Sequence, residues 1–368
     1  MILTQGADAP RSGSDASLMK IAVFLPNWVG DVVMATPALR AIREHFADAY
    51  LIGVLKPYVA GVLDGLCWLD RLIFRDSQGP WSRRMPVVIN DLRHERLDLA
   101  ILFTNSFRSG LMAYLSGCRR RVGYARDGRS PLLTDRLDPV RDSAGKLVPS
   151  PVIEAYNRLA AHVGCPQPGY RMELATTFRN ERAADVVWRQ AGLLAYPEVV
   201  CLNPGAAFGS AKLWPTDSFA EMARLLAERR GCGVLVLCGP AEKNLAADIV
   251  RQARHPAIHS VAGHPLSLGL TKACIRRADL LITTDSGPRH FAAAFDRPVV
   301  TLFGPTHISW TETYHPHAVH LQKKVDCGPC QLRTCPLDHR CMKLLTPVEV
   351  FNAAQELLAR RIPRRDAG

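Results

Sequence analysis

Three short segments carry residues of useful chemical type directly after predicted buried strands. The first is Asn27-Trp28-Val29-Gly30-Asp31, in which Gly30 permits a tight turn and Asp31 stands at the start of a predicted helix. A carboxylate at the mouth of a cleft can act as a general base. Composition alone favours the alternative, in which Asp31 caps the helix and interacts with its dipole.

The second segment, residues 203–215, is rich in small residues and ends in Lys212-Leu213-Trp214-Pro215. Small side chains let backbone N–H groups approach a phosphate, and Lys212 would add a positive charge. A flexible loop with an incidental lysine is the alternative. Trp214 followed by Pro215 indicates instead that the loop is docked.

The third segment runs from Thr283 to His290 with the sequence TTDSGPRH. Ser286 can cap the next helix, Gly287 lacks a Cβ, and Pro288 suits the first helical position. Free N–H groups and the positive end of the helix dipole would then face a ligand and could hold a diphosphate without a metal. A structural cap explains Ser286 and Pro288 but not their neighbours. Gly304-Pro305-Thr306 ends the next strand and is expected to face the same cleft.

Charge narrows the class of partner. The 368 residues include 46 Lys and Arg against 34 Asp and Glu, a net charge of +12. This balance favours nucleic acid, an acidic membrane surface or a phosphorylated substrate. Residues 83–129 contain ten Arg and four Asp or Glu. These arginines could bind phosphate or carboxylate groups, and a solvated basic face explains them equally well. No G-x-G-x-x-G or Walker A sequence is present, which argues against nicotinamide and P-loop enzymes.

The amino-terminal residues 1–18 lack the apolar core of a signal peptide and are expected to be a disordered tail. No run of about 18 apolar residues occurs, so no membrane-spanning helix is expected. The sequence therefore predicts a cytoplasmic protein.

Alternating strands and helices predict two α/β units with parallel sheets, which bind ligands beyond the carboxyl ends of their strands. The first unit has predicted strands at 20–25, 50–55 and 98–103, helices after Asp31 and at 152–163, and a loop at 126–150. The second has five predicted strands, at 199–203, 233–239, 258–263, 279–284 and 298–304, and helices at 218–230, 241–253, 267–278 and 288–295. A last helix is expected at 347–361.

Four of the eleven cysteines cluster near the carboxyl terminus, with His339 beside them: Cys327, Cys330, Cys335 and Cys341. Their spacing could hold one tetrahedral zinc ion. Two disulfides, which a reducing cytosol disfavours, and a loop of reduced thiols are the alternatives.

Taken together, these segments resemble glycosyltransferase family 9, the bacterial ADP-heptose:lipopolysaccharide heptosyltransferases, and look most like the heptosyltransferase II branch. The resemblance rests on residues 26–43, 203–215, 283–306 and 327–336. It implies an α/β GT-B fold, in which two Rossmann-like domains face each other across a cleft. The implied parts are a tail at 1–18, an acceptor-binding domain at 19–175, an ADP-sugar-binding domain at 176–346, and a helix at 347–368 that crosses back toward the first domain.

The resemblance also implies the reaction, which is transfer of L-glycero-D-manno-heptose from ADP-heptose to the inner core of lipopolysaccharide. The implied transfer is inverting and needs no metal. Addition of the second heptose is the step that the resemblance favours. Asp31 matches the catalytic base, and Lys212 matches the lysine that stabilises charge on the diphosphate. Glu242 matches the family's acidic residue that holds the ribose, and Asp285 matches the carboxylate that contacts the heptose. Leu266 matches a position near the adenine-contacting backbone. The implied donor-binding residues are Gly205, Lys212, Glu242, Leu266, Asp285, Ser286, Gly287, His290 and Thr306.

This chain departs from some relatives at Ala207 and Phe208, where they have hydroxyl residues. Phosphate binding is therefore expected to depend on backbone N–H groups, Lys212 and Ser286. The expected acceptor-binding residues are Gly30, Arg93 and Arg120, because lipid A–Kdo carries phosphates and carboxylates that arginine recognises.

The implied partners are ADP-heptose and Kdo-lipid A or heptosyl-Kdo-lipid A, met at the cytoplasmic face of the inner membrane. Transfer needs no cofactor, and zinc would be structural. Two alternatives remain. One is a related GT-B enzyme with another nucleotide sugar or acceptor, including heptosyltransferase I or III types; the other is a basic, zinc-bearing nucleic-acid-binding protein. The chain lacks helix-turn-helix, RRM and zinc-finger spacings, so no nucleic acid partner is expected.

Overall fold

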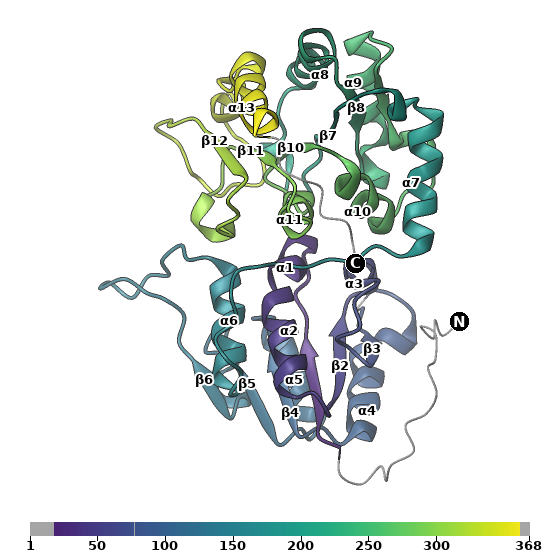
Figure 1. Ribbon diagram of the computed structural model, residues 1–368. Helices are drawn as coiled ribbons and strands as arrows, with labels where there is room; N and C mark the ends of the chain where they lie inside the picture. The colour runs from purple at the N-terminus through teal and green to yellow at the C-terminus, as the bar shows by residue number, and fades with distance from the viewer. Residues whose placement is uncertain (1–17, 77, 361–368) are drawn as a thin grey trace.

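The computed structural model describes residues 18–76 and 78–360 and forms two lobes that face each other (Figure 1). Each lobe contains a six-stranded parallel sheet covered by helices. The predicted α/β class with two Rossmann-like halves is confirmed. The predicted tail at residues 1–18 falls, apart from Leu18, outside the described residues.

The first sheet has the strand order β3-β2-β1-β4-β5-β6. Strand β4 is apolar and fully buried, and β1 is buried after Lys20, as both faces of a parallel sheet require. The strands are β1 (Lys20–Phe24), β2 (Tyr50–Leu55), β3 (Arg71–Phe74), β4 (Leu99–Leu102), β5 (Arg120–Tyr124) and β6 (Asp135–Leu137).

The second sheet has the order β12-β11-β10-β7-β8-β9, which repeats the topology of the first. In both sheets the order of strand addition reverses between two central parallel strands, β1 and β4 in one and β7 and β10 in the other. Ligands bind at such a switch point. The strands are β7 (Val199–Asn203), β8 (Gly233–Val236), β9 (Ile258–Ser260), β10 (Leu280–Thr284), β11 (Val299–Phe303) and β12 (Ala318–Gln322).

Helices of the first lobe surround its sheet: α1 (Val29–Met34), α2 (Thr36–His45), α3 (Ala60–Leu63), α4 (Met85–Glu95), α5 (Phe107–Leu115) and α6 (Val152–His162). The single helix expected after Asp31 is two helices. They meet at Ala35, and Pro37 occupies the first turn of α2, where its missing N–H costs no hydrogen bond.

Helices of the second lobe are α7 (Phe178–Gln190), α8 (Thr216–Arg230), α9 (Lys243–Ala253), α10 (Leu268–Arg277), α11 (Pro288–Ala294), α12 (Arg340–Lys343) and α13 (Pro347–Ala359). A capping box between Thr177 and Asn180 begins α7, which follows the connection between the lobes. No helix among the described residues is long and apolar enough to span a bilayer.

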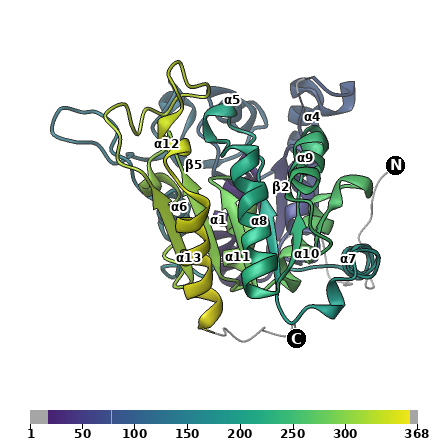
Figure 2. The same ribbon diagram turned by 90° about the horizontal axis from the view of Figure 1, so that it is seen from above.

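The final helix does not cross back to the first lobe, so that expectation is wrong for the described residues. Figure 2 shows α13 beside α8, and its apolar face packs on α8, β10 and β11 of the second sheet. Val350, Phe351 and Leu357 are buried there. The apolar face of α13 is therefore used within the second lobe.

Direct helix contacts join the lobes near the centre of the molecule. Helix α1 meets α11, and α3 meets α10 (Figure 1). The fully buried Lys272 of α10 donates hydrogen bonds to the carbonyl oxygens of Val62, at 3.1 Å, and Asp64, at 2.9 Å. These contacts bring the switch points of the two sheets face to face.

Candidate active site

A cleft lies where the turn after β1 faces the loops that follow β7 and β10. All three segments singled out in the sequence contribute to its wall. The lining residues are Trp28, Gly30, Asp31, Met34, Ala207, Phe208, Lys212, Asp285, Ser286, Gly287, His290 and Thr311.

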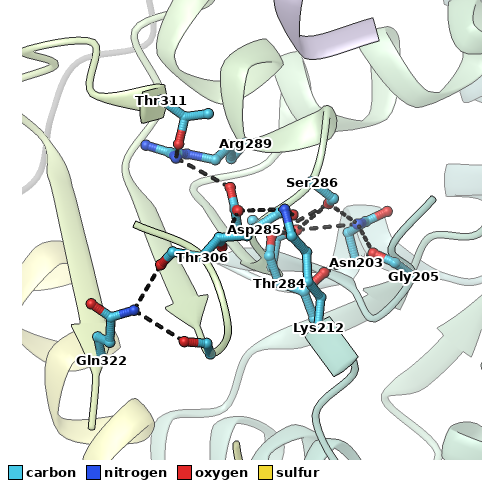
Figure 3. A network of polar contacts seen from close by, with 12 residues as sticks. Asn203, Gly205, Lys212, Thr284, Asp285, Ser286, Arg289, Thr306, Thr311 and Gln322 are labelled. Atoms are coloured by element: carbon cyan, nitrogen blue, oxygen red, sulfur yellow. Dashed lines mark hydrogen bonds and ion pairs between the residues drawn. The ribbon is translucent and has the colours of Figure 1, made fainter. Parts of the chain in front are cut away.

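The carboxylate of Asp285 is the centre of a buried polar network (Figure 3). Lys212 Nζ lies 2.5 Å from Asp285 Oδ2 and donates to the Asp285 carbonyl oxygen at 3.1 Å. Thr306 Oγ1 donates to the same Oδ2 at 2.7 Å, and Arg289 Nη1 lies 3.4 Å from Oδ1. Burial alone would raise the pKa of Asp285, but Lys212 and Arg289 hold it below its usual value.

Residues beyond the expected donor-binding residues support this network. The buried Arg289 also donates to Thr311 Oγ1 at 2.7 Å, and its second terminal nitrogen lies 3.2 Å from His320 Nε2. Gln322 on β12 donates to the carbonyl oxygens of Gly304, at 3.1 Å, and Thr306, at 2.8 Å (Figure 3). Because β12 was not predicted, its residues His320 and Gln322 could not be found from sequence. Arg289 lies in the segment Thr283–His290, which the sequence did indicate.

The loop after β10 presents backbone N–H groups to the cleft. Within the described part of the chain, the N–H groups of Ser286 and Gly287 donate to no backbone acceptor. The N-cap of α11 is Gly287, not Ser286 as expected. The hydroxyl of Ser286 is instead held by Asn203 Nδ2 at 3.0 Å, which links the ends of β7 and β10.

Glu242 lies directly against Gly205. Its carboxylate accepts a hydrogen bond from Gly239 N–H at 2.8 Å, and a Cβ at position 205 would collide with it. Gly205 therefore lets the Glu242 carboxylate lie against the backbone, which a side chain at position 205 would prevent. Leu266 precedes α10, packs against the core and is not among the residues that line the cleft.

Asp31 lies in the first turn of α1, across the cleft from this network. The N-cap of α1 is Trp28 and no side-chain cap bond is formed, so Asp31 does not cap the helix, although its place in the first turn agrees with the expected dipole interaction. No hydrogen bond to the Asp31 side chain occurs within residues 18–76 and 78–360. Burial raises its pKa to about 7; Lys212 opposes this shift and Asp285 adds to it.

Gly30 allows the two lobes to approach. A Cβ there would lie 2.7 Å from His290 Cδ2 and 3.4 Å from Gly287 Cα. His290 is buried, and burial together with the Arg289 charge keeps its pKa well below the usual value. Gly30 also lines the cleft, and its expected role in acceptor binding stays a prediction.

Arg93 and Arg120 do not reach the cleft, so the structure corrects their expected role in acceptor binding. Arg120 begins β5, at the amino end of a parallel strand, and bonds Asp135 at 2.8 Å. Arg93 lies near the end of α4, where Nε donates to the Leu115 carbonyl oxygen at 2.7 Å. Ligands bind at the opposite, carboxyl edge of such a sheet.

The structure does not assemble the four clustered cysteines as a metal site. In the described residues, no group of three or more His, Cys, Asp or Glu side chains could hold a metal ion. Cys327 and Cys330 are exposed, whereas Cys341 is buried. The zinc site remains a prediction from sequence, and no step below depends on it.

The loop that carries Lys212 is docked, as predicted. Trp214 is buried, packs edge-on against Phe219 and donates from Nε1 to the Leu345 carbonyl oxygen at 3.0 Å. Lys212 itself is nearly buried, and its ammonium group lies 4.8 Å from the centre of the Phe208 ring.

Comparison with known proteins agrees with this geometry. Two relatives are each 29% identical: lipooligosaccharide heptosyltransferase 2 of Campylobacter jejuni, over 92% of this chain and 98% of that protein, and lipopolysaccharide heptosyltransferase 2 of Salmonella typhimurium, over 80% and 85%. The solved structure of Escherichia coli ADP-heptose LPS heptosyltransferase II superposes with a TM-score of 0.75 at 25% identity, covering 93% of this chain and 99% of that one.

The model of glycosyltransferase family 9 (heptosyltransferase) matches residues 87–340, which is more than half of the chain. The matched region includes the Asp285 network and the Lys212 loop, and the fold is the GT-B arrangement of the related structure. This chain therefore belongs to glycosyltransferase family 9 and is a glycosyltransferase.

Proposed function

We propose that this enzyme transfers heptose from ADP-heptose to the inner core of lipopolysaccharide and adds the second heptose. The relatives named heptosyltransferase 2, which match along most of their length, support the donor and the acceptor class. The acceptor is then heptosyl-Kdo-lipid A, met at the cytoplasmic face of the inner membrane.

The observation that carries the proposal is the placement of Asp31 opposite the Lys212–Asp285 pair. A general base works best when its pKa lies near the working pH, and burial raises the pKa of Asp31 to about 7. Its carboxylate takes the proton of the acceptor hydroxyl, whose oxygen forms a bond to the anomeric carbon. The bond from that carbon to the diphosphate oxygen breaks on the opposite face, and its electron pair leaves with ADP.

The second lobe supplies the charge that the leaving diphosphate needs. Lys212 and the free N–H groups of Ser286 and Gly287 line the cleft and can stabilise the developing negative charge. Attack from the face opposite ADP inverts the anomeric centre. We propose that these groups suffice for transfer and that no metal takes part.

Direct transfer tests the proposal. The enzyme is incubated with ADP-heptose and either bare Kdo₂-lipid A or the same lipid already carrying one heptose, and ADP release is followed with and without EDTA. Turnover that requires the first heptose and persists in EDTA is expected. Turnover on the bare acceptor alone would contradict addition of the second heptose, and no turnover on either would contradict heptose transfer.

A further inference from the structure

The cysteine-bearing loop, residues 327–341, packs against the loop that carries Lys212. The carbonyl oxygen of Arg333 accepts a hydrogen bond from Ala211 N–H at 3.0 Å, and His339 Nε2 lies 2.7 Å from the Ala211 carbonyl oxygen. A Cβ at Gly209 would collide with the Arg333 carbonyl. The backbone at position 333 is therefore fixed against the loop on the wall of the cleft.

A second contact holds the cysteine-bearing loop against the segment that follows β11. Gln331 N–H donates to the Pro305 carbonyl oxygen at 2.7 Å, and Pro305 precedes the Thr306 that bonds Asp285. The cysteine-bearing loop thus bridges the segments after β7 and β11. Both segments belong to the proposed donor side of the cleft.

This docking places the side chain of Arg333 beside Phe208. Its guanidinium carbon lies 5.4 Å from the centre of the Phe208 ring, and Lys212 Nζ lies 4.8 Å from the same centre. Phe208 and Lys212 line the cleft, and the Arg333 guanidinium lies beside the same ring, next to the lining residues rather than among them. Arg333 is exposed, and no carboxylate in the described part of the chain pairs with it.

The two cations differ in what they are free to bind. Lys212 already contacts both the carboxylate and the carbonyl oxygen of Asp285, so part of its hydrogen-bonding capacity is used. Ala207 and Phe208 offer a phosphate no hydroxyl group. Arg333 keeps its whole planar fork of N–H donors, which matches a phosphate with two parallel hydrogen bonds.

We propose that Arg333 binds the diphosphate of the nucleotide-sugar donor, with Phe208 as the platform that orients its guanidinium. The function of the cysteine-bearing loop is then to position Arg333 beside Phe208. The inference rests on the proposed function, because it takes an ADP-sugar as the donor.

Calorimetric titration of the full chain with ADP tests the inference without any acceptor. Arg333→Ala is expected to weaken ADP binding about tenfold, the effect of losing charge-assisted hydrogen bonds. The ADP affinity of Arg333→Lys should lie between those of the wild type and Arg333→Ala, because lysine keeps the charge but loses the planar pair of N–H donors. Adenosine, which has no phosphate, should bind Arg333→Ala and the wild type equally.

Arg340→Ala is the matched control. Arg340 is an arginine of the same loop, but its guanidinium is paired with Asp338 at 3.0 Å. This variant should bind ADP as the wild type does.

Equal ADP affinity in the wild type and Arg333→Ala would overturn the inference alone. A parallel loss of ADP and adenosine binding, with a lower melting temperature, would assign Arg333 a structural role and also overturn it. Failure of the wild type to bind ADP would overturn both this inference and the proposed function.

Discussion

The two lobes share one strand order but shift the pKa values of Asp285 and Asp31 in opposite directions. Asp285 in the second lobe has Lys212, Arg289 and Thr306 as partners, and its pKa is lowered. Asp31 in the first lobe lies in an apolar turn, and its pKa rises to about 7. The difference matches the two tasks. Under the proposed function, the ionised Asp285 holds the Lys212 ammonium in place for the donor diphosphate. A carboxylate that can take a proton is needed where the acceptor hydroxyl would arrive.

The largest effect is expected from Asp31→Asn, which keeps the shape of the side chain but removes the base. Turnover should fall by roughly 10³-fold, within the range that general-base catalysis contributes. ADP binding, measured by calorimetry, should not change, because the donor network lies in the other lobe. Turnover close to that of the wild type would make Asp31 a structural residue and would remove the contrast between the lobes.

Lys212→Gln should have the next largest effect. It removes a charge that contacts Asp285 and faces the proposed diphosphate, so kcat/KM should fall by about 10²-fold. Steady-state kinetics on ADP-heptose measure this, with a thermal melt to show that the chain still folds. A loss confined to the KM for the acceptor would contradict its placement on the donor side.

Gly30→Ala tests whether the lobes must approach as closely as they do. The new Cβ would lie 2.7 Å from His290 Cδ2, so one lobe must shift, and kcat/KM should fall by about tenfold or more.

Gly61→Ala is the matched control for this change. Gly61 also faces the opposite lobe, but its Cβ would lie 3.5 Å from Leu268 Cβ, an ordinary van der Waals contact. Its activity should equal that of the wild type. Equal activity in both variants would show that the distance between α1 and α11 does not limit catalysis.

Sequence predicted the second lobe well because its strands are long apolar runs bounded by clear turns. The strand predicted at 199–203 has the same bounds as β7, and Asp285, Lys212 and Thr306 come together as their places after successive strands require. The sixth strand, β12, was missed because it is a partly buried edge strand with two polar residues among its five. Gln322 was missed with it.

The first lobe was predicted less completely. Its edge strands β3 and β6 are short and partly exposed, and β6 falls in the region expected to be a loop. The choice of Arg93 and Arg120 failed because charge density along the sequence does not tell which edge of a sheet an arginine occupies. Arg120 begins its strand, and only the register of β4 against β5 reveals that it lies away from the cleft.

The network around Asp285 could be only partly anticipated. The sequence gives the order of Thr283, Asp285 and Ser286 but not which hydroxyl each side chain contacts. Asn203 bonding to Ser286 depends on how β7 and β10 are paired in space. Arg289 bonding back to Asp285 is a local contact between residues four apart, but the sequence alone does not show that both side chains turn toward each other. The raised pKa of Asp31 likewise depends on its burial in the folded chain, which no local pattern encodes.

The pH dependence of kcat/KM for heptose transfer tests the central contrast most directly. Asp31 must be ionised to accept a proton, so activity should rise with pH through about 7 and then level off. Because the Lys212 charge lowers the pKa of Asp31, Lys212→Gln should move this rise to higher pH. A profile that is flat between about pH 5 and 8, or that rises near the usual pKa of an aspartate at about 4, would contradict the account.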